Sequence, residues 1–114
     1  MGMMKLQDTG AVADTGFLDR VARRFVLKTL RQFPAGQLVI TEPDGQQVVL
    51  GHGEPAGCIT IRDWRTYRML FTGGSLGAGE AFMEELWSSE DLTGVIRYFA
   101  ANVSAMQDLE KGAA

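Results

Sequence analysis

The chain has 114 residues, a length that suits one domain with a modest hydrophobic core. Its formal net charge of −3 argues against a general role in nucleic-acid binding. Cys58 and His52 are the only residues of their types, so an internal disulfide is excluded and a zinc site would need several carboxylates. The first residues lack the apolar core of a signal peptide. We therefore expect a cytoplasmic protein without a metal site.

Charge is unevenly distributed along the chain. Residues 14–33 carry five basic and two acidic side chains, whereas residues 78–114 carry two basic and seven acidic ones. We expect residues 1–13 to be a disordered tail, and Asp14 or Thr15 to cap a helix over 17–33. At 100° per residue its apolar side chains share one side, and these are Leu18, Val21, Ala22, Phe25, Val26, Leu30 and Phe33.

The other side of this helix is basic, and its cations are Arg20, Arg23, Arg24, Lys28 and Arg31. Such a helix either packs on its own domain with its arginines solvated or lies on an anionic membrane. An intermediate arrangement satisfies both patterns: the apolar side packs inward and the cations meet phospholipid head groups or an acidic partner. We take these five cations as candidate head-group or membrane contacts, which would place the protein at the periphery of the inner membrane face.

A β-hairpin is predicted next. Alternating apolar residues over 38–41 and the apolar run 48–50 flank Pro43-Asp44-Gly45, in which proline presets φ and glycine accepts a positive φ. Residues 58–62 (CITIR) have the β-branched side chains of a third strand. We expect three antiparallel strands.

Three helices are predicted after the sheet. Asp63 would cap a helix that starts at Trp64 and stops at Gly73 and Gly74. A short helix over 80–87 would follow, and Ser88 or Ser89, with Ser88 and Asp91 resembling a capping box, would start the last helix. Its apolar stripe consists of Leu92, Val95, Ile96, Phe99, Val103 and Met106. The fold class is therefore α+β: an amphipathic helix, a small three-stranded sheet and three helices packed on it, in one domain over 14–112.

The glycine cluster at 73–79 does not predict a phosphate site. A phosphate loop joins a strand to a helix N-terminus, whereas these glycines follow a helix, and Glu80 brings a negative charge to the next one. Glu80 and Glu84 share a helix face, but an acidic face is usually a solvated one. No side chain that could act as a nucleophile is placed by the sequence next to one that could act as its base. We therefore expect no catalytic residue in this chain.

Large apolar side chains concentrate after the sheet. In a small α+β domain they form the core, line an apolar cavity for an acyl chain, or form an interface. The candidate pocket or interface residues are Trp64, Tyr67, Phe71, Phe82 and Trp87.

The order of these motifs over residues 36–112 resembles the N-terminal domain of the cyclopropane-fatty-acyl-phospholipid synthase family. That domain has a Pro-Asp-Gly hairpin, a strand ending in Asp, a glycine-rich turn leading into Gly-Glu-Ala-Tyr/Phe-Met, a Trp and an Asp-Leu helix. The corresponding residues here are Pro43-Asp44-Gly45, Ile59-Thr60-Ile61-Arg62-Asp63, Gly73-Gly74, Gly77, Gly79-Glu80-Ala81-Phe82-Met83, Trp87 and Asp91-Leu92.

The resemblance implies a non-catalytic, lipid- or membrane-facing accessory domain with a fold similar to sterol-carrier proteins. Enzymes of that family methylate or cyclopropanate acyl chains of membrane phospholipids. Their S-adenosylmethionine and catalytic residues belong to a methyltransferase domain downstream, which we expect to be absent here, so no cofactor is implied for this chain. The implied partners are a phospholipid or fatty acyl chain and a catalytic methyltransferase domain or subunit. The alternative is a protein-interaction module that forms homo-oligomers or docks on a separate methyltransferase subunit.

Overall fold

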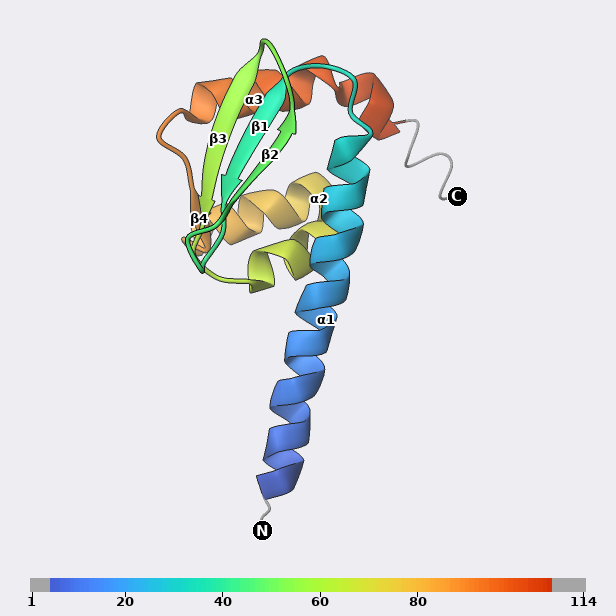
Figure 1. The fold of residues 1–114 in the computed structure, drawn as a ribbon, viewed down its shortest axis with the longest axis vertical. Coiled ribbons are helices and arrows are strands. Elements are labelled where there is room, and N and C mark those ends of the chain that lie inside the picture. The colour runs from blue at the N-terminus through green and yellow to red at the C-terminus, as the bar shows by residue number, and fades with distance from the viewer. Residues whose placement is uncertain (1–4, 108–114) are drawn as a thin grey trace.

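The computed structural model describes the backbone of residues 5–107 and the side chains of residues 16–107. In chain order the elements are α1 (Lys5–Arg31), β1 (Gln37–Thr41), β2 (Gln47–Gly51), β3 (Ala56–Ile61), α2 (Arg65–Met83), β4 (Trp87–Ser88) and α3 (Leu92–Ala101). The helices cover one face of the sheet, and the first turns of α1 project beyond it (Figure 1). The predicted α+β class is confirmed. No helix of the described residues is long and apolar enough to cross a membrane.

The sheet differs from the predicted three antiparallel strands. It has four strands in the order β2-β1-β3-β4, and β3 runs parallel to β1 with Ile40 opposite Ile59. The hairpin places β2 on one side of β1 and ends β2 beside the start of β1, and the connection 52–55 then crosses to the other side of β1. As a result β3 joins the free side of β1 in the same direction. Strand β4 has only two residues, too few for an alternating pattern to reveal.

Alternation along the strands makes the sheet one-sided. Leu38 and Ile40 of β1, Leu50 of β2 and Ile61 of β3 are at most 2 % exposed and face the helices, whereas Val49 is 57 % exposed on the opposite face. These buried side chains form the core together with apolar residues of α1 and two tyrosines. The core therefore lies between the sheet and the helical layer.

Helix α2 ends and turns differently from the prediction. The two predicted helices are joined across a kink at Gly74, whose φ of 57° and ψ of −133° are open to glycine alone. The second segment folds back so closely that a Cβ on Gly77 would lie 2.0 Å from the carbonyl oxygen of Met69. Helical geometry resumes directly after the kink and ends at Met83, so the predicted start of a second helix at Glu80 and its predicted end at Trp87 are both wrong.

The helix starts also differ. Helix α1 begins at Lys5 rather than at Asp14 or Thr15, and the parts of the predicted tail and domain that fall on residues 1–4 and 108–114 lie outside the described residues. The cap of α3 is Asp91, whose carboxylate accepts a hydrogen bond from the Gly94 amide at 3.0 Å. Ser88 belongs to β4 instead, because the chain is still paired with β3 at that point.

Candidate functional site

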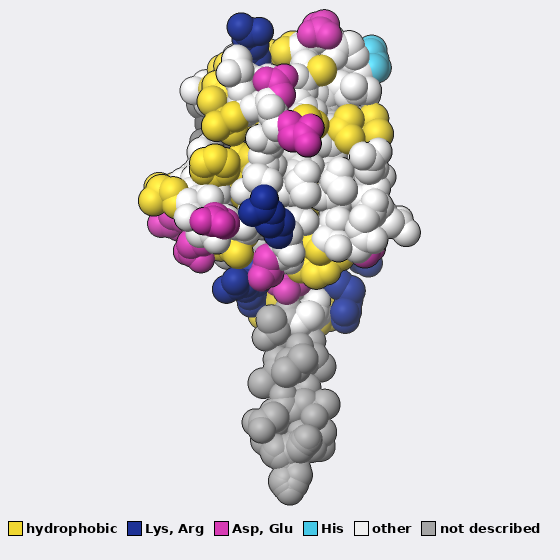
Figure 2. Space-filling model, turned by 90° about the vertical axis from the view of Figure 1, so that its left-hand side faces the viewer, with side chains coloured by type: hydrophobic (Ala, Val, Ile, Leu, Met, Phe, Trp, Pro, Cys, Tyr) yellow, Lys and Arg dark blue, Asp and Glu magenta, His cyan; other side chains and the backbone are white. Residues whose placement is uncertain are grey.

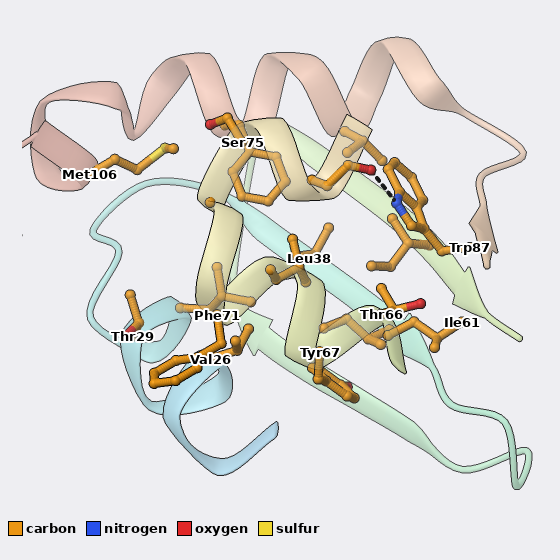
Figure 3. Close-up of a pocket in the computed structure, with 18 of the residues that line it drawn as sticks. Val26, Thr29, Leu38, Ile61, Thr66, Tyr67, Phe71, Ser75, Trp87 and Met106 are labelled. Atoms are coloured by element: carbon orange, nitrogen blue, oxygen red, sulfur yellow. Dashed lines mark hydrogen bonds between the residues drawn. The ribbon is translucent and has the colours of Figure 1, made fainter. Parts of the chain in front are cut away.

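An apolar cavity of about 430 Å³ lies between the inner face of the sheet and the helices (Figure 3). Its size falls in the range of small-molecule sites. Every layer contributes to its walls. The larger lining side chains are Phe25, Val26, Leu30 and Phe33 from α1 and its end, Leu38, Ile40, Ile59 and Ile61 from the sheet, Tyr67, Leu70 and Phe71 from α2, Trp87 from β4, and Leu92, Val95, Ile96, Phe99 and Met106 from α3 and beyond.

The cavity arises because the helices pack against different neighbours and leave a space between them. Helix α3 packs mainly against β3, whereas α1 packs mainly against α2. At the contact of α3 with β3, Gly57 and Gly94 allow the backbones to meet: a Cβ on Gly57 would lie 2.9 Å from Val95 Cα. A space is thereby left between α3 on one side and α1 and α2 on the other. Its lining residues bound it on both sides.

The cavity has a closed floor and an open mouth. Leu38 and Ile40 on the sheet are 0 % and 1 % exposed, so the floor is sealed from water. Phe25 on α1, Phe71 on α2 and Ile96 on α3 are between 47 % and 60 % exposed and surround the mouth. A ligand would therefore enter between the helices and reach toward the sheet.

The lining lacks charge among the described residues. Its side-chain polar groups are few, and three of them already have hydrogen-bond partners: Thr66 donates to the Leu86 carbonyl, Tyr67 to Glu42, and the Trp87 indole N–H to the Ala78 carbonyl at 2.9 Å. Figure 3 shows the Trp87 indole directed along this bond. The hydroxyls of Thr29 and Ser75 are the other polar side-chain groups of the wall. Such a surface suits a hydrocarbon ligand.

Three of the five predicted pocket residues line the cavity, namely Tyr67, Phe71 and Trp87. Trp64 and Phe82 do not. Trp64 stacks on Tyr67 with ring centroids 6.2 Å apart, and Phe82 lies 5.0 Å from Trp87. These two rings therefore support the wall from behind.

Sequence reasoning did not assign α3 to the site. Its predicted apolar stripe is only partly covered, because Leu92, Ile96 and Val103 are 38 %, 60 % and 47 % exposed. Val95 of the stripe is buried, and so are Tyr98 and the cap residue Asn102, which do not belong to the stripe. The sequence did contain a signal for this exposed surface. A helix that has more apolar residues than it can pack on one side leaves some of them exposed.

The predicted cations separate into two groups. Arg23 is bound to Glu42, with its Nε and Nη2 atoms 2.6 Å and 3.0 Å from the carboxylate oxygens. The hydrogen bond to Glu42 raises the pKa of Arg23 further above its ordinary value. The other four, namely Arg20, Arg24, Lys28 and Arg31, are exposed. Lys and Arg side chains gather near the first described turns of α1 at the lower end of the surface in Figure 2.

Among the side chains of residues 16–107 no group of three or more His, Cys, Asp or Glu is arranged to hold a metal ion. Glu80 and Glu84, considered above as a carboxylate pair, are both exposed at the end of α2. Comparison of the chain with protein-family models, with curated proteins and with solved structures gives no match.

Proposed function

We propose that this chain is a non-catalytic lipid-binding domain that holds a phospholipid acyl chain and presents it to a catalytic domain outside this chain. The observation that carries the proposal is the uncharged cavity between the sheet and the helices. Following the sequence resemblance, the catalytic partner would be a methyltransferase of the cyclopropane-fatty-acyl-phospholipid synthase type. S-adenosylmethionine would bind that partner.

The chemistry of the wall supports an acyl chain over a polar metabolite. Burial of hydrocarbon gains about 0.8 kcal/mol per methylene, so about ten methylenes would gain about 8 kcal/mol before the cost of ordering the chain. A charged head group would lose its hydration in the cavity and find no countercharge in the lining. The head group would therefore stay outside, within reach of exposed cations of α1. Arg23 is not among them, because Glu42 already occupies its guanidinium.

An interaction module is the second candidate, and one surface favours it. Leu76 and Met83 on the second segment of α2 are 73 % and 79 % exposed and stand seven residues apart, which places them on the same side of the segment. Neither lines the cavity. This apolar patch would dock the catalytic domain or subunit.

The test of the acyl-chain proposal is organic extraction of the purified chain followed by mass spectrometry, together with titration by a fluorescent fatty acid in solution. Stoichiometric phospholipid or saturable probe binding supports the proposal. An Ile59→Glu variant, with a charge in the wall, is the matched loss-of-binding control, and its fold is checked by circular dichroism. Absence of both lipid and probe binding from the folded wild type refutes it.

A further inference from the structure

The described part of α1 exposes apolar side chains that the domain does not cover. Ala22, Val26 and Leu30 face inward and are at most 9 % exposed. Phe17 and Val21, by contrast, are 57 % and 44 % exposed. The single apolar side predicted for this helix is therefore split, with one part in the core and the other on the surface.

The exposed side of α1 has a basic edge and an apolar edge. At 100° per residue, Arg20, Arg24 and Arg31 fall along one edge and Leu18, Val21 and Phe25 along the other. Phe17 and Lys28 lie between them. Within residues 16–31 the only carboxylate is that of Asp19, which is largely buried and forms an ion pair with Arg68 at 3.2 Å. The exposed surface of this stretch is thus made of cations and apolar groups without an anion.

The apolar edge continues into the mouth of the cavity. Phe25 lines that mouth, and its ring meets the ring of Phe71 edge-on with centroids 4.9 Å apart. Phe71 lines the mouth from α2 and is 47 % exposed. A partner that covers the apolar edge of α1 would therefore also touch the entrance of the cavity.

We propose that this surface of α1 docks on an anionic phospholipid bilayer. Phe17, Val21 and Phe25 would insert among the head groups, the arginines of the basic edge would lie on lipid phosphates, and the mouth of the cavity would open toward the membrane. Interfacial helices have this combination of a cationic edge and aromatic or aliphatic side chains. The loading role rests on the proposed function, whereas the docking itself does not.

Charge favours a bilayer over a second copy of the chain. In a symmetric pair whose two α1 helices face each other, each α1 would have to offer anions to the cations of the other, and the exposed side of residues 16–31 has none. An anionic bilayer supplies phosphates at any position along the basic edge. Each Lys or Arg near such a surface strengthens binding about fivefold.

The experiment is co-sedimentation of the purified chain with vesicles of phosphatidylcholine and phosphatidylglycerol, and with vesicles of phosphatidylcholine alone. We expect binding that needs phosphatidylglycerol and weakens with salt. A Phe17→Ser/Val21→Ser variant should bind at least tenfold more weakly, and an Arg20→Glu/Arg24→Glu variant should lose its preference for phosphatidylglycerol. None of these residues lines the cavity.

The matched control is Val49→Ser, which removes an exposed valine from the outer face of the sheet and should bind vesicles like the wild type. Equal vesicle binding by the wild type and the Phe17→Ser/Val21→Ser variant overturns the docking proposal. So does a wild-type dimer, measured by sedimentation velocity, that these substitutions dissociate while vesicles bind neither form. Binding of the fluorescent fatty acid without vesicles separates the two proposals: if vesicles bind but the probe does not, docking stands and the acyl-chain function fails.

Discussion

The phenolic oxygen of Tyr67 lies 2.6 Å from Oε2 of Glu42, and that carboxylate also receives two hydrogen bonds from Arg23. Glu42 follows β1 directly and is only 4 % exposed, while Arg23 belongs to α1 and Tyr67 to α2. One buried carboxylate thus joins the sheet to two helices. A buried carboxylate is tolerated only when it is paired and hydrogen-bonded.

Arg23→Gln should therefore destabilise the domain. Glu42 would retain Tyr67 but lose its countercharge, and we expect the free energy of unfolding to fall by about 2 kcal/mol, less than for a fully buried pair because the Arg23 side chain is 37 % exposed. Urea unfolding followed by circular dichroism measures it. Arg65→Gln removes an arginine from an exposed ion pair and should leave the midpoint unchanged. Equal midpoints for the wild type and Arg23→Gln would show that the pair contributes nothing.

Tyr67 also makes the stability depend on alkaline pH. Burial and the hydrogen bond to Glu42 raise the pKa of Tyr67 well above its ordinary value of 10.0. The unfolded state then loses its proton above about pH 10 while the folded state keeps it, so stability is full below that pH and declines above it. Burial raises the pKa of Tyr98 in the same direction.

Measurement of unfolding free energy across this pH range tests the prediction. In Tyr67→Phe the slope above pH 10 should be shallower than in the wild type by about 1.4 kcal/mol per pH unit, the value for one proton. Tyr98→Phe serves as the comparison for the second tyrosine. Parallel slopes for Tyr67→Phe and the wild type would contradict the raised pKa of Tyr67.

The side chain of Asn102 links the end of α3 to the segment after α1 by hydrogen bonds. Its side chain is buried, accepts a hydrogen bond from the Ala35 amide at 3.0 Å, and donates to the carbonyls of Ala35 and Tyr98. Asn102→Ala would leave three backbone groups without these partners, and we expect a loss of about 3 kcal/mol in unfolding free energy. Ser104→Ala, at an exposed neighbouring position, is the control and should have no effect. If Asn102→Ala lowers the unfolding free energy no more than an ordinary surface substitution does, water replaces the hydrogen bonds of the Asn102 side-chain amide.

Local patterns predicted much of the fold. The turn Pro43-Asp44-Gly45, the hairpin and the break at Gly74 follow from the conformational preferences of proline and glycine. The parallel pairing of β3 with β1 did not follow, because strand direction depends on the path of the connecting loop. The joining of two predicted helices into α2 depends on how closely the backbone at Gly77 approaches Met69, a contact within the folded structure that composition does not encode.

The cavity was only partly predictable, for a similar reason. The sequence identifies apolar side chains but not which of them fail to find a packing partner. Phe71 and Trp87 were candidates and line the cavity, whereas Trp64 and Phe82, of the same chemical type, pack behind it. Glu42 gave no signal as a buried group, since a glutamate beside a turn is usually solvated.

Trp87 is predicted to limit the length of a bound acyl chain. It and Met106 lie at opposite ends of the cavity in Figure 3. The hydrogen bond to Ala78 and the contact with Phe82 hold the indole in place, whereas Met106 has a flexible side chain.

Affinity for fatty acids of increasing length should rise about fourfold per methylene and then level off when the chain reaches Trp87. In Trp87→Leu the shorter side chain should move that plateau to longer acids. Val49→Ser, on the outer face of the sheet and outside the cavity lining, should keep the wild-type plateau. Competition against a fluorescent fatty acid measures the series, and an unchanged plateau in Trp87→Leu would show that the closed end of the cavity lies elsewhere.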